Sequence, residues 1–203
     1  DEKAFIVGVI ADTSISSPSA VSDKPMPLFV RIGQLAKTVG ELDIAQVEAV
    51  RRAVGDTMAI GVDANQGWRV ALIDDAPLWT LDRATEFAHA CADLRVSWIE
   101  EPLDMHDWDG MAELRRRIKT PLSGAELLGD WHEVRPVFEH DCLDKYQPDA
   151  TFCGGLAVSK RIMDECRERG LDFSPHTWSN GIGLVIIMHR LCDSRQSRHR
   201  DHR

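Results

Sequence analysis

The feature of this 203-residue sequence that most constrains its fold is a repeated pair, a short apolar run followed by a helical pattern. Such β-then-α units predict a parallel sheet with right-handed crossovers. Successive apolar runs end in a titratable residue, at Asp63, Glu100, Glu126, Asp149 and His176. A β/α barrel places all strand carboxyl ends around one mouth, so these side chains would meet in one cavity.

A doubly wound sheet is the alternative α/β architecture, and it gathers ligand groups at a single switch point. The sequence has neither the dinucleotide-binding glycine fingerprint nor a phosphate-binding P-loop. We therefore favour the barrel, although periodicity alone leaves the choice open. A closed eight-stranded barrel usually needs about 250 residues, so the prediction is a partial barrel of the α/β class.

The expected elements alternate along the chain. Strands are predicted over residues 28–33, 59–63, 96–100, 120–126, 145–149 and 172–176, with a further candidate over 5–10. Helices are predicted over residues 43–54, 81–94, 107–118, 130–138 and 158–169. Asp43 is the expected N-cap of the first helix, and Gly170 the glycine that stops the last.

The sequence divides into three parts. Residues 1–27 form an N-terminal segment whose stretch over 11–27 is rich in Ser, Pro, Thr and Asp and is expected to be irregular. Residues 28–189 form the barrel domain. Residues 190–203 are polar and rich in arginine, without an apolar period, and we expect a disordered tail there.

Composition excludes several classes of protein. A hydrophobic content of 43 % with 28 % charged residues is that of a globular protein rather than a disordered one. The net charge of −9 argues against nucleic acid or an anionic membrane as the main partner. Five scattered cysteines without a CxxC pair predict reduced thiols and a cytoplasmic location. We also expect neither a signal peptide nor a membrane span.

Three strand-end carboxylates, Asp63, Glu100 and Glu126, carry the strongest chemical signal. Oxygen ligands of this kind suit a hard cation such as Mg²⁺. A single strand-end acid is more often a helix cap or a solvated loop residue, in roughly two cases of three, because barrel mouths are polar. Three acids in the same relative position favour the metal site.

His176 and Asp149 end the two remaining strands and suggest a second chemical group. A carboxylate beside an imidazole fixes its tautomer and raises its basicity, as a general base requires. Most histidines of the chain have no such setting, and we expect these four to be solvated: His89, His106, His132 and His140.

Five motifs occur in order at β/α spacing. They are Val62-Asp63-Ala64-Asn65-Gln66-Gly67-Trp68, Trp98-Ile99-Glu100-Glu101-Pro102-Leu103, Ser123-Gly124-Ala125-Glu126, Gln147-Pro148-Asp149 with Gly154-Gly155, and Ser174-Pro175-His176-Thr177. Together they resemble the C-terminal barrel of the enolase superfamily, in its mandelate racemase/muconate lactonizing enzyme branch. The resemblance covers residues 28–189.

The resemblance implies a modified (β/α)₇β barrel that uses Mg²⁺ to remove the proton α to a carboxylate. It implies that the metal is held by Asp63, Glu100 and Glu126. It assigns the His–Asp dyad to His176 and Asp149. Asn65 matches a family position that helps to hold the substrate or the metal-bound water. Gln147 and Trp178 are further substrate-binding candidates, Trp178 because it lies beside His176. Assembly into a homo-oligomer is also implied, because barrels of this family commonly assemble.

Three departures from the family pattern shape the expected reaction. The second lysine of the family's Lys-x-Lys motif, a base on the opposite substrate face, is matched by Arg31. An arginine stays protonated, so it is a poor base but can stabilise a developing enolate. Compared with the family pattern, we also expect this sequence to lack the N-terminal capping domain and the acid-bearing final strand.

Without the second base, the preferred function is dehydration of a sugar acid rather than racemisation. His176 would abstract the α-proton and then act as the acid for the departing hydroxyl. The alternatives are a racemase or epimerase of the same superfamily, and a truncated barrel fragment that is not catalytic.

Overall fold

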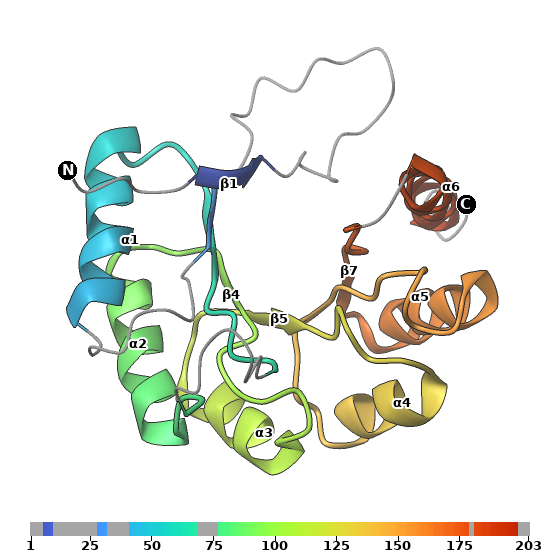
Figure 1. Ribbon diagram of the computed structural model, residues 1–203, viewed down its shortest axis with the longest axis horizontal. Helices are drawn as coiled ribbons and strands as arrows, with labels where there is room; N and C mark the ends of the chain where they lie inside the picture. Colours follow the sequence, from blue (N-terminus) through green and yellow to red (C-terminus); the bar gives the residue numbers. More distant parts are fainter. Residues whose placement is uncertain (1–5, 10–27, 32–40, 69–76, 179–180, 199–203) are drawn as a thin grey trace. The chain divides into compact units, whose positions relative to one another are not determined.

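The computed structural model describes residues 6–9, 28–31, 41–68, 77–178 and 181–198, with side chains described over 43–68, 77–178 and 181–189. The chain divides into two compact units, residues 1–122 and 123–203. Strands and helices alternate in chain order in both units, except that the first two strands follow each other (Figure 1). The predicted α/β class is confirmed.

The first unit contains β1 (Ile6–Val9), β2 (Leu28–Arg31), β3 (Ile60–Asp63) and β4 (Trp98–Glu100). β2, β3 and β4 pair in parallel, as predicted, whereas β1 joins β2 antiparallel. The parallel register puts Arg31 opposite Asp63, and Asp63 opposite Glu100. The carboxyl ends of these strands therefore lie in one row.

Three helices of the first unit lie side by side along its strands (Figure 1). They are α1 (Glu41–Val54), α2 (Leu81–Asp93) and α3 (Trp108–Arg117). α2 and α3 are capped by Thr80 and Asp107, whose side chains accept a hydrogen bond from a backbone N–H of the first turn. The core between helices and strands is apolar and includes Val47, Ile60, Val62, Phe87, Ile99 and Leu114.

Asp43 is not the N-cap of α1, and that prediction is wrong. α1 begins two residues earlier, at Glu41, and Asp43 lies inside its first turn. The Asp43 carboxylate accepts a hydrogen bond from Arg83 Nη2 at 3.1 Å. Burial raises the pKa of the Asp43 carboxyl, and Arg83 opposes that rise. The acid serves a helix–helix contact rather than a helix end.

Arg51 joins the ends of α1 and α2. Its side chain is 8 % exposed, and its guanidinium donates to four backbone carbonyls, those of Gly55, Met58, Leu94 and Arg95, at 2.8–3.0 Å. Carbonyls at the end of a helix have no partner within the helix. One buried guanidinium therefore satisfies carbonyls of two separate segments and fixes the spacing between them.

Trp98 packs directly over a glycine of the neighbouring strand. Gly61 and Trp98 are register partners on β3 and β4. A Cβ atom on Gly61 would stand 2.2 Å from Trp98 Cζ2, far inside van der Waals contact. The lack of a side chain at Gly61 therefore leaves the space in which the Trp98 indole packs against the sheet.

The strands of the second unit are β5 (Leu122–Gly124), whose first residue is the last of the first unit, β6 (Lys145–Tyr146) and β7 (Asp172–Phe173). They pair in parallel and in chain order. Its helices are α4 (Trp131–Glu139), α5 (Leu156–Arg169) and α6 (Gly181–Arg198). Phe138 of α4 stacks on Tyr146 of β6 with ring centroids 4.0 Å apart. Gly170 ends α5 with a left-handed φ of 70°, as the sequence predicts.

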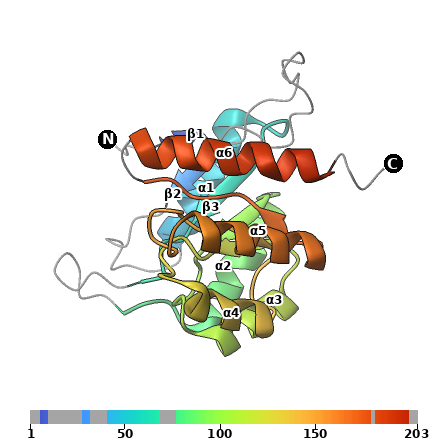
Figure 2. The same cartoon turned by 90° about the vertical axis from the view of Figure 1, so that its right-hand side faces the viewer.

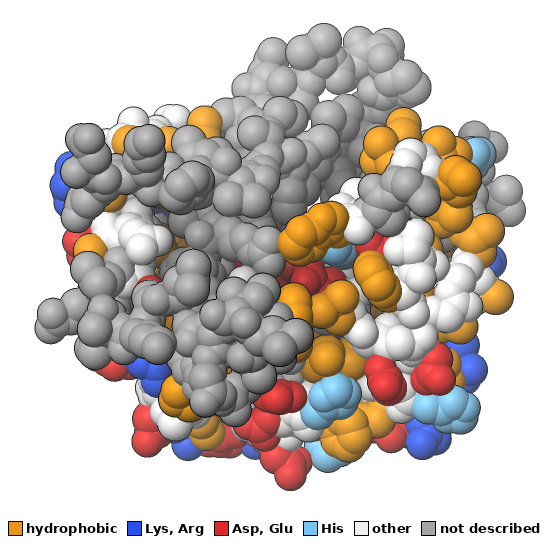
Figure 3. Space-filling view, in the orientation of Figure 1, with side chains coloured by type: hydrophobic (Ala, Val, Ile, Leu, Met, Phe, Trp, Pro, Cys, Tyr) orange, Lys and Arg blue, Asp and Glu red, His pale blue; other side chains and the backbone are white. Residues whose placement is uncertain are grey.

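α6 lies beside α5 in both views (Figures 1 and 2) and extends further than expected. Residues 190–198 are helical, where we expected a disordered tail. The stretch from 184 to 198 has no Pro or Gly to break the helix. Apolar side chains of α6 gather on the surface (Figure 3), namely Ile182, Leu184, Val185 and Met188. None of the described helices is long and apolar enough to cross a membrane.

Candidate active site

The first unit contributes two neighbouring carboxylates. Asp63 and Glu100 end β3 and β4 as register partners, and they are only 6 % and 3 % exposed. Adjacent parallel strands lie about 4.8 Å apart, so two acids share a small buried volume. Like charges in such a setting repel each other, and a cation between them relieves that repulsion. The carboxylate oxygens of Asp63 and Glu100 are ligands that suit a hard cation such as Mg²⁺.

The segments that follow these two strands are hydrogen-bonded to each other. The backbone N–H of Ala64 donates to the Glu100 carbonyl at 2.9 Å, and that of Gln66 donates to the Glu101 carbonyl at 2.8 Å. Asn65 turns with a positive φ of 54°, and its N–H donates to Asp63 Oδ1 at 2.8 Å. The backbone thus orients the Asp63 carboxylate and buries Asn65 beside it.

Glu101 explains the glycine of the first motif. It also has a positive φ, of 46°, and is 2 % exposed. Its carboxylate lies so close to Gly67 that a Cβ there would stand 2.4 Å from Oε2. Neither the contact nor the strained backbone is visible in the sequence, where Glu101 reads only as the second acid of a pair.

The second unit brings three predicted site residues together around one imidazole. His176 Nδ1 lies 3.0 Å from Asp149 Oδ2, and His176 Nε2 lies 3.2 Å from Glu126 Oε2. Glu126 follows Ala125, which turns the chain after β5 with a φ of 78°. The Asp149–His176 contact falls within the range of about 2.6–3.2 Å expected of an acid–base pair.

Asp149 is fully buried and accepts four hydrogen bonds. Oδ1 accepts from the backbone N–H and the hydroxyl of Thr151, at 2.8 and 2.6 Å. Oδ2 accepts from the backbone N–H of Trp178 at 3.1 Å and faces His176. Burial would raise the pKa of the Asp149 carboxyl, but the bonds from Thr151, Trp178 and His176 outweigh it and lower that pKa.

The predicted substrate-binding residues differ in exposure. Gln147 is 4 % exposed, and its N–H donates to the Gly124 carbonyl at 2.8 Å. The Trp178 side chain is 66 % exposed, two residues beyond His176. The backbone of Arg31 is opposite Asp63, but its side chain lies outside the described residues.

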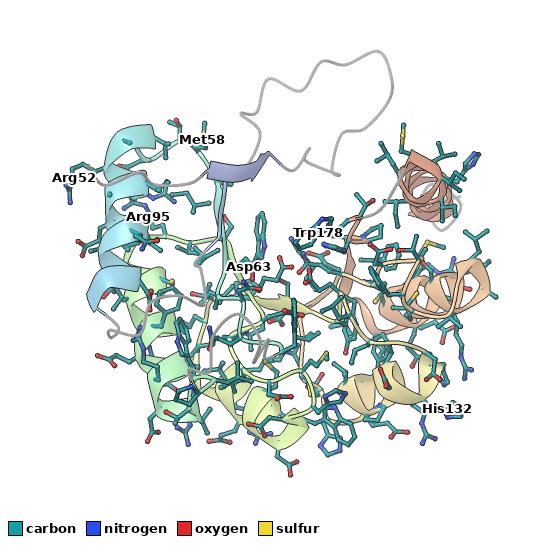
Figure 4. All side chains as sticks on the ribbon, in the orientation of Figure 1. Arg52, Met58, Asp63, Arg95, His132 and Trp178 are labelled. Atoms are coloured by element: carbon teal, nitrogen blue, oxygen red, sulfur yellow. The ribbon has the colours of Figure 1, made fainter. Side chains whose placement is uncertain are left out.

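The four histidines expected to be solvated are all exposed: His89, His106, His132 and His140. Figure 4 shows His132 on the outer side of α4. Among the described residues, no group of three His, Cys, Asp or Glu side chains is arranged to hold a metal ion. Asp63 and Glu100 belong to the first unit and Glu126 to the second, so the three-ligand site remains a prediction.

The described strands and helices form an α/β protein, and its structural neighbours are β/α-barrel proteins, of which the chain covers only part. The model of the enolase C-terminal domain-like family matches residues 30–202. The chain belongs to this family, and its solved and curated relatives lie in the mandelate racemase/muconate lactonizing enzyme branch.

Two solved structures illustrate the likeness. The 3,6-anhydro-D-galactonate cycloisomerase of Zobellia galactanivorans is 28 % identical with a TM-score of 0.69, over 80 % of this chain and 42 % of that protein. The L-talarate dehydratase of Polaromonas, solved with Mg and L-glucarate, is 32 % identical with a TM-score of 0.64, over 74 % of this chain and 38 % of that one. Mg²⁺ is the cofactor of enolase-superfamily enzymes.

Curated relatives include dehydratases and racemases. The L-talarate/galactarate dehydratase of Salmonella typhimurium is 33 % identical over 66 % of this chain and 31 % of its own length. The N-succinyl-L-Arg/Lys racemase of Bacillus cereus is 31 % identical over 64 % of this chain and 32 % of its own length. The chain thus spans about a third of the length of these relatives.

Proposed function

We propose that this chain removes the proton α to the carboxylate of a small sugar acid, in a Mg²⁺-dependent reaction, with His176 as the base. The observation that carries the proposal is the 3.0 Å contact between His176 Nδ1 and the buried Asp149 carboxylate, while Nε2 faces Oε2 of Glu126, a proposed Mg²⁺ ligand, at 3.2 Å. The contact with Asp149 keeps a proton on Nδ1. Nε2 is then the nitrogen that accepts the substrate proton.

Asp149 supports both halves of the proton transfer. It orients the ring before transfer and stabilises the imidazolium after it, because a buried ionised carboxylate lies against Nδ1. Its lowered pKa keeps the carboxylate ionised at neutral pH. Protonated His176 then returns the proton to the departing β-hydroxyl in a dehydration.

Asp63, Glu100 and Glu126 are the residues that would hold Mg²⁺. When bound, the ion supplies the positive charge that makes an α-proton acidic enough to remove. Each of these acids is less than 10 % exposed, so their negative charge is little screened by water. In the same proposal Asn65, Gln147 and the exposed ring of Trp178 bind the substrate, and Arg31 stabilises the negative charge that develops on it.

Dehydration of a sugar acid is the preferred reaction. It is supported by 33 % identity to a talarate/galactarate dehydratase and 28 % to an arabinonate dehydratase of Saccharolobus solfataricus. Racemisation or epimerisation is the second candidate, supported by 31 % identity to a racemase. Cys91, Cys153 and Cys166 are buried and form no disulfide, which supports the proposed cytoplasmic location. A homo-oligomer stays part of the proposal.

Product analysis tests the proposal. The full chain is incubated in the presence of Mg²⁺ with one acid at a time: galactarate, L-talarate, L-glucarate or arabinonate. Dehydration gives a 2-keto acid, detected as its semicarbazone, whereas epimerisation gives no keto acid and a change in optical rotation. We expect keto acid from at least one of these acids and none from the His176→Asn variant. Failure of both readouts would leave the non-catalytic fragment as the correct interpretation.

A further inference from the structure

We infer that Thr151 is a positioning residue for the base, since its hydroxyl fixes the carboxylate of Asp149 so that Oδ2 faces His176. This inference rests on the proposed role of His176. Thr151 belongs to none of the positions singled out by motif. Thr151 as a whole is exposed, yet its hydroxyl donates a hydrogen bond to the Asp149 carboxylate, and the Asp149 side chain is 0 % exposed.

The two oxygens of Asp149 have separate sets of donors. Oδ1 takes both bonds from Thr151, at 2.8 Å from the backbone N–H and 2.6 Å from the hydroxyl. Oδ2 takes the Trp178 N–H at 3.1 Å and faces His176 Nδ1 at 3.0 Å. The Thr151 hydroxyl makes the shortest of these contacts.

This division matters because the terminal torsion of an aspartate is broad and nearly two-fold. Without the hydroxyl, one backbone donor remains on each oxygen, the Thr151 N–H on Oδ1 and the Trp178 N–H on Oδ2, and the carboxylate can tilt Oδ2 away from the imidazole more easily. Two donors on Oδ1 define the carboxylate plane. The Thr151 N–H comes with any residue except proline at that position, so the hydroxyl is the anchor that the side chain itself supplies.

Two substitutions separate this role from a purely structural one. Thr151→Val keeps the size and branching of the side chain and removes the hydroxyl, whereas Thr151→Ser keeps the hydroxyl. Thr85→Val is the matched control, because the Thr85 hydroxyl also makes one short bond, 2.7 Å to the Leu81 carbonyl, inside α2. If Thr151→Val fails to fold, as judged by circular dichroism, Thr151→Ala replaces it.

The first readout is the ¹H NMR signal of the His176 Nδ1 proton in the full chain, assigned by its loss in His176→Asn. We expect this downfield signal in the wild type, Thr151→Ser and Thr85→Val, and its upfield shift or loss in Thr151→Val. An unchanged signal in Thr151→Val, equal loss in Thr151→Ser, or no such signal in the wild type would overturn the inference.

The second readout is turnover of whichever acid the wild type converts. We expect Thr151→Val to lower kcat about tenfold with KM within about twofold, as for a misoriented catalytic group. Thr151→Ser restores kcat to within about threefold of the wild type. A chain that turns over nothing, yet shows the Thr151-dependent proton signal, rejects the proposed function and retains the positioning role. Equal kcat in Thr151→Val and wild type rejects the positioning role.

Discussion

Nδ1 of His176 lies 3.0 Å from Oδ2 of Asp149, although 27 positions separate the two residues in the sequence. They follow β7 and β6, which are parallel neighbours. The His176 N–H also donates to the Pro148 carbonyl at 3.2 Å, so the two loops are joined by backbone as well as side chain. The acid–base pair is therefore a direct product of the strand order.

Asp149→Asn tests the dyad. An asparagine leaves the loop geometry in place but can favour the wrong imidazole tautomer, so we expect α-proton exchange to fall by about 10³- to 10⁴-fold. Exchange is measured by ¹H NMR in D₂O. Asp164→Asn is the control, because it removes one partner of the Lys160–Asp164 ion pair on the surface of α5. This substitution should leave the rate unaltered. Full exchange in Asp149→Asn would contradict the assigned role.

Arg51→Met tests the buried guanidinium between α1 and α2. Four carbonyls lose their donor, so we expect the free energy of unfolding to fall by about 2–4 kcal/mol. Urea denaturation measures the change. Arg52→Met is the matched control, because Arg52 is exposed and projects outward from α1 (Figure 4), and its effect should stay within about 0.5 kcal/mol. Equal effects of the two substitutions would disprove the account of Arg51.

Gly61→Ala tests the contact between β3 and β4. The new methyl group would overlap the Trp98 indole, with the nearest atom at 2.2 Å, and we expect a loss of about 1–3 kcal/mol in unfolding free energy. Gly181→Ala, where nothing lies within 4 Å, should be neutral or stabilising by about 0.5–1 kcal/mol at the start of α6. A neutral Gly61→Ala would mean that Trp98 lies elsewhere.

The buried cysteines predict a pH response. Burial raises the pKa of the Cys91 thiol to about 12 and that of Cys153 to about 11. At pH 8 the fraction of Cys91 present as thiolate is then about one in ten thousand. Ellman's reagent should therefore label Cys91 and Cys153 only after unfolding. Because the unfolded thiols ionise near pH 9, unfolding releases protons above that pH, and these two groups lower stability as pH rises. Rapid native labelling of Cys91 would contradict its burial.

Much of the fold follows from local patterns. Five helices were predicted to within about two residues at each end, because apolar periodicity and capping residues such as Asp107 and Asp130 mark them directly. The N-cap prediction for Asp43 is wrong because the sequence does not distinguish an aspartate that caps a helix from one that lies in the first turn. In the structure Asp43 of α1 contacts Arg83 of α2. The helix through Arg198 does not follow from the hydrophobic pattern, because residues 190–198 are polar and lack an apolar period, although no Pro or Gly interrupts them.

The candidate site was predicted less completely. The pairing of Asp149 with His176 follows from strand order and motif spacing, so the sequence could indicate it. Thr151 and Glu101 could not be found in this way, because their roles depend on where a hydroxyl points and on how closely a carboxylate approaches Gly67. Such details are set by backbone dihedrals, which residue type alone does not fix.

The most direct measurement of the central claim is deuterium exchange at the α-carbon of galactarate, L-talarate, L-glucarate and arabinonate. The full chain and its His176→Asn variant are compared in D₂O with Mg²⁺, and Mg²⁺ binding is followed by calorimetry. We expect exchange of at least one acid by the wild type, a loss of about 10²- to 10⁴-fold in His176→Asn, and a Mg²⁺ affinity that is retained. Exchange that continues unchanged in His176→Asn, or no exchange of any of these acids by a wild type that binds Mg²⁺, would contradict the central claim.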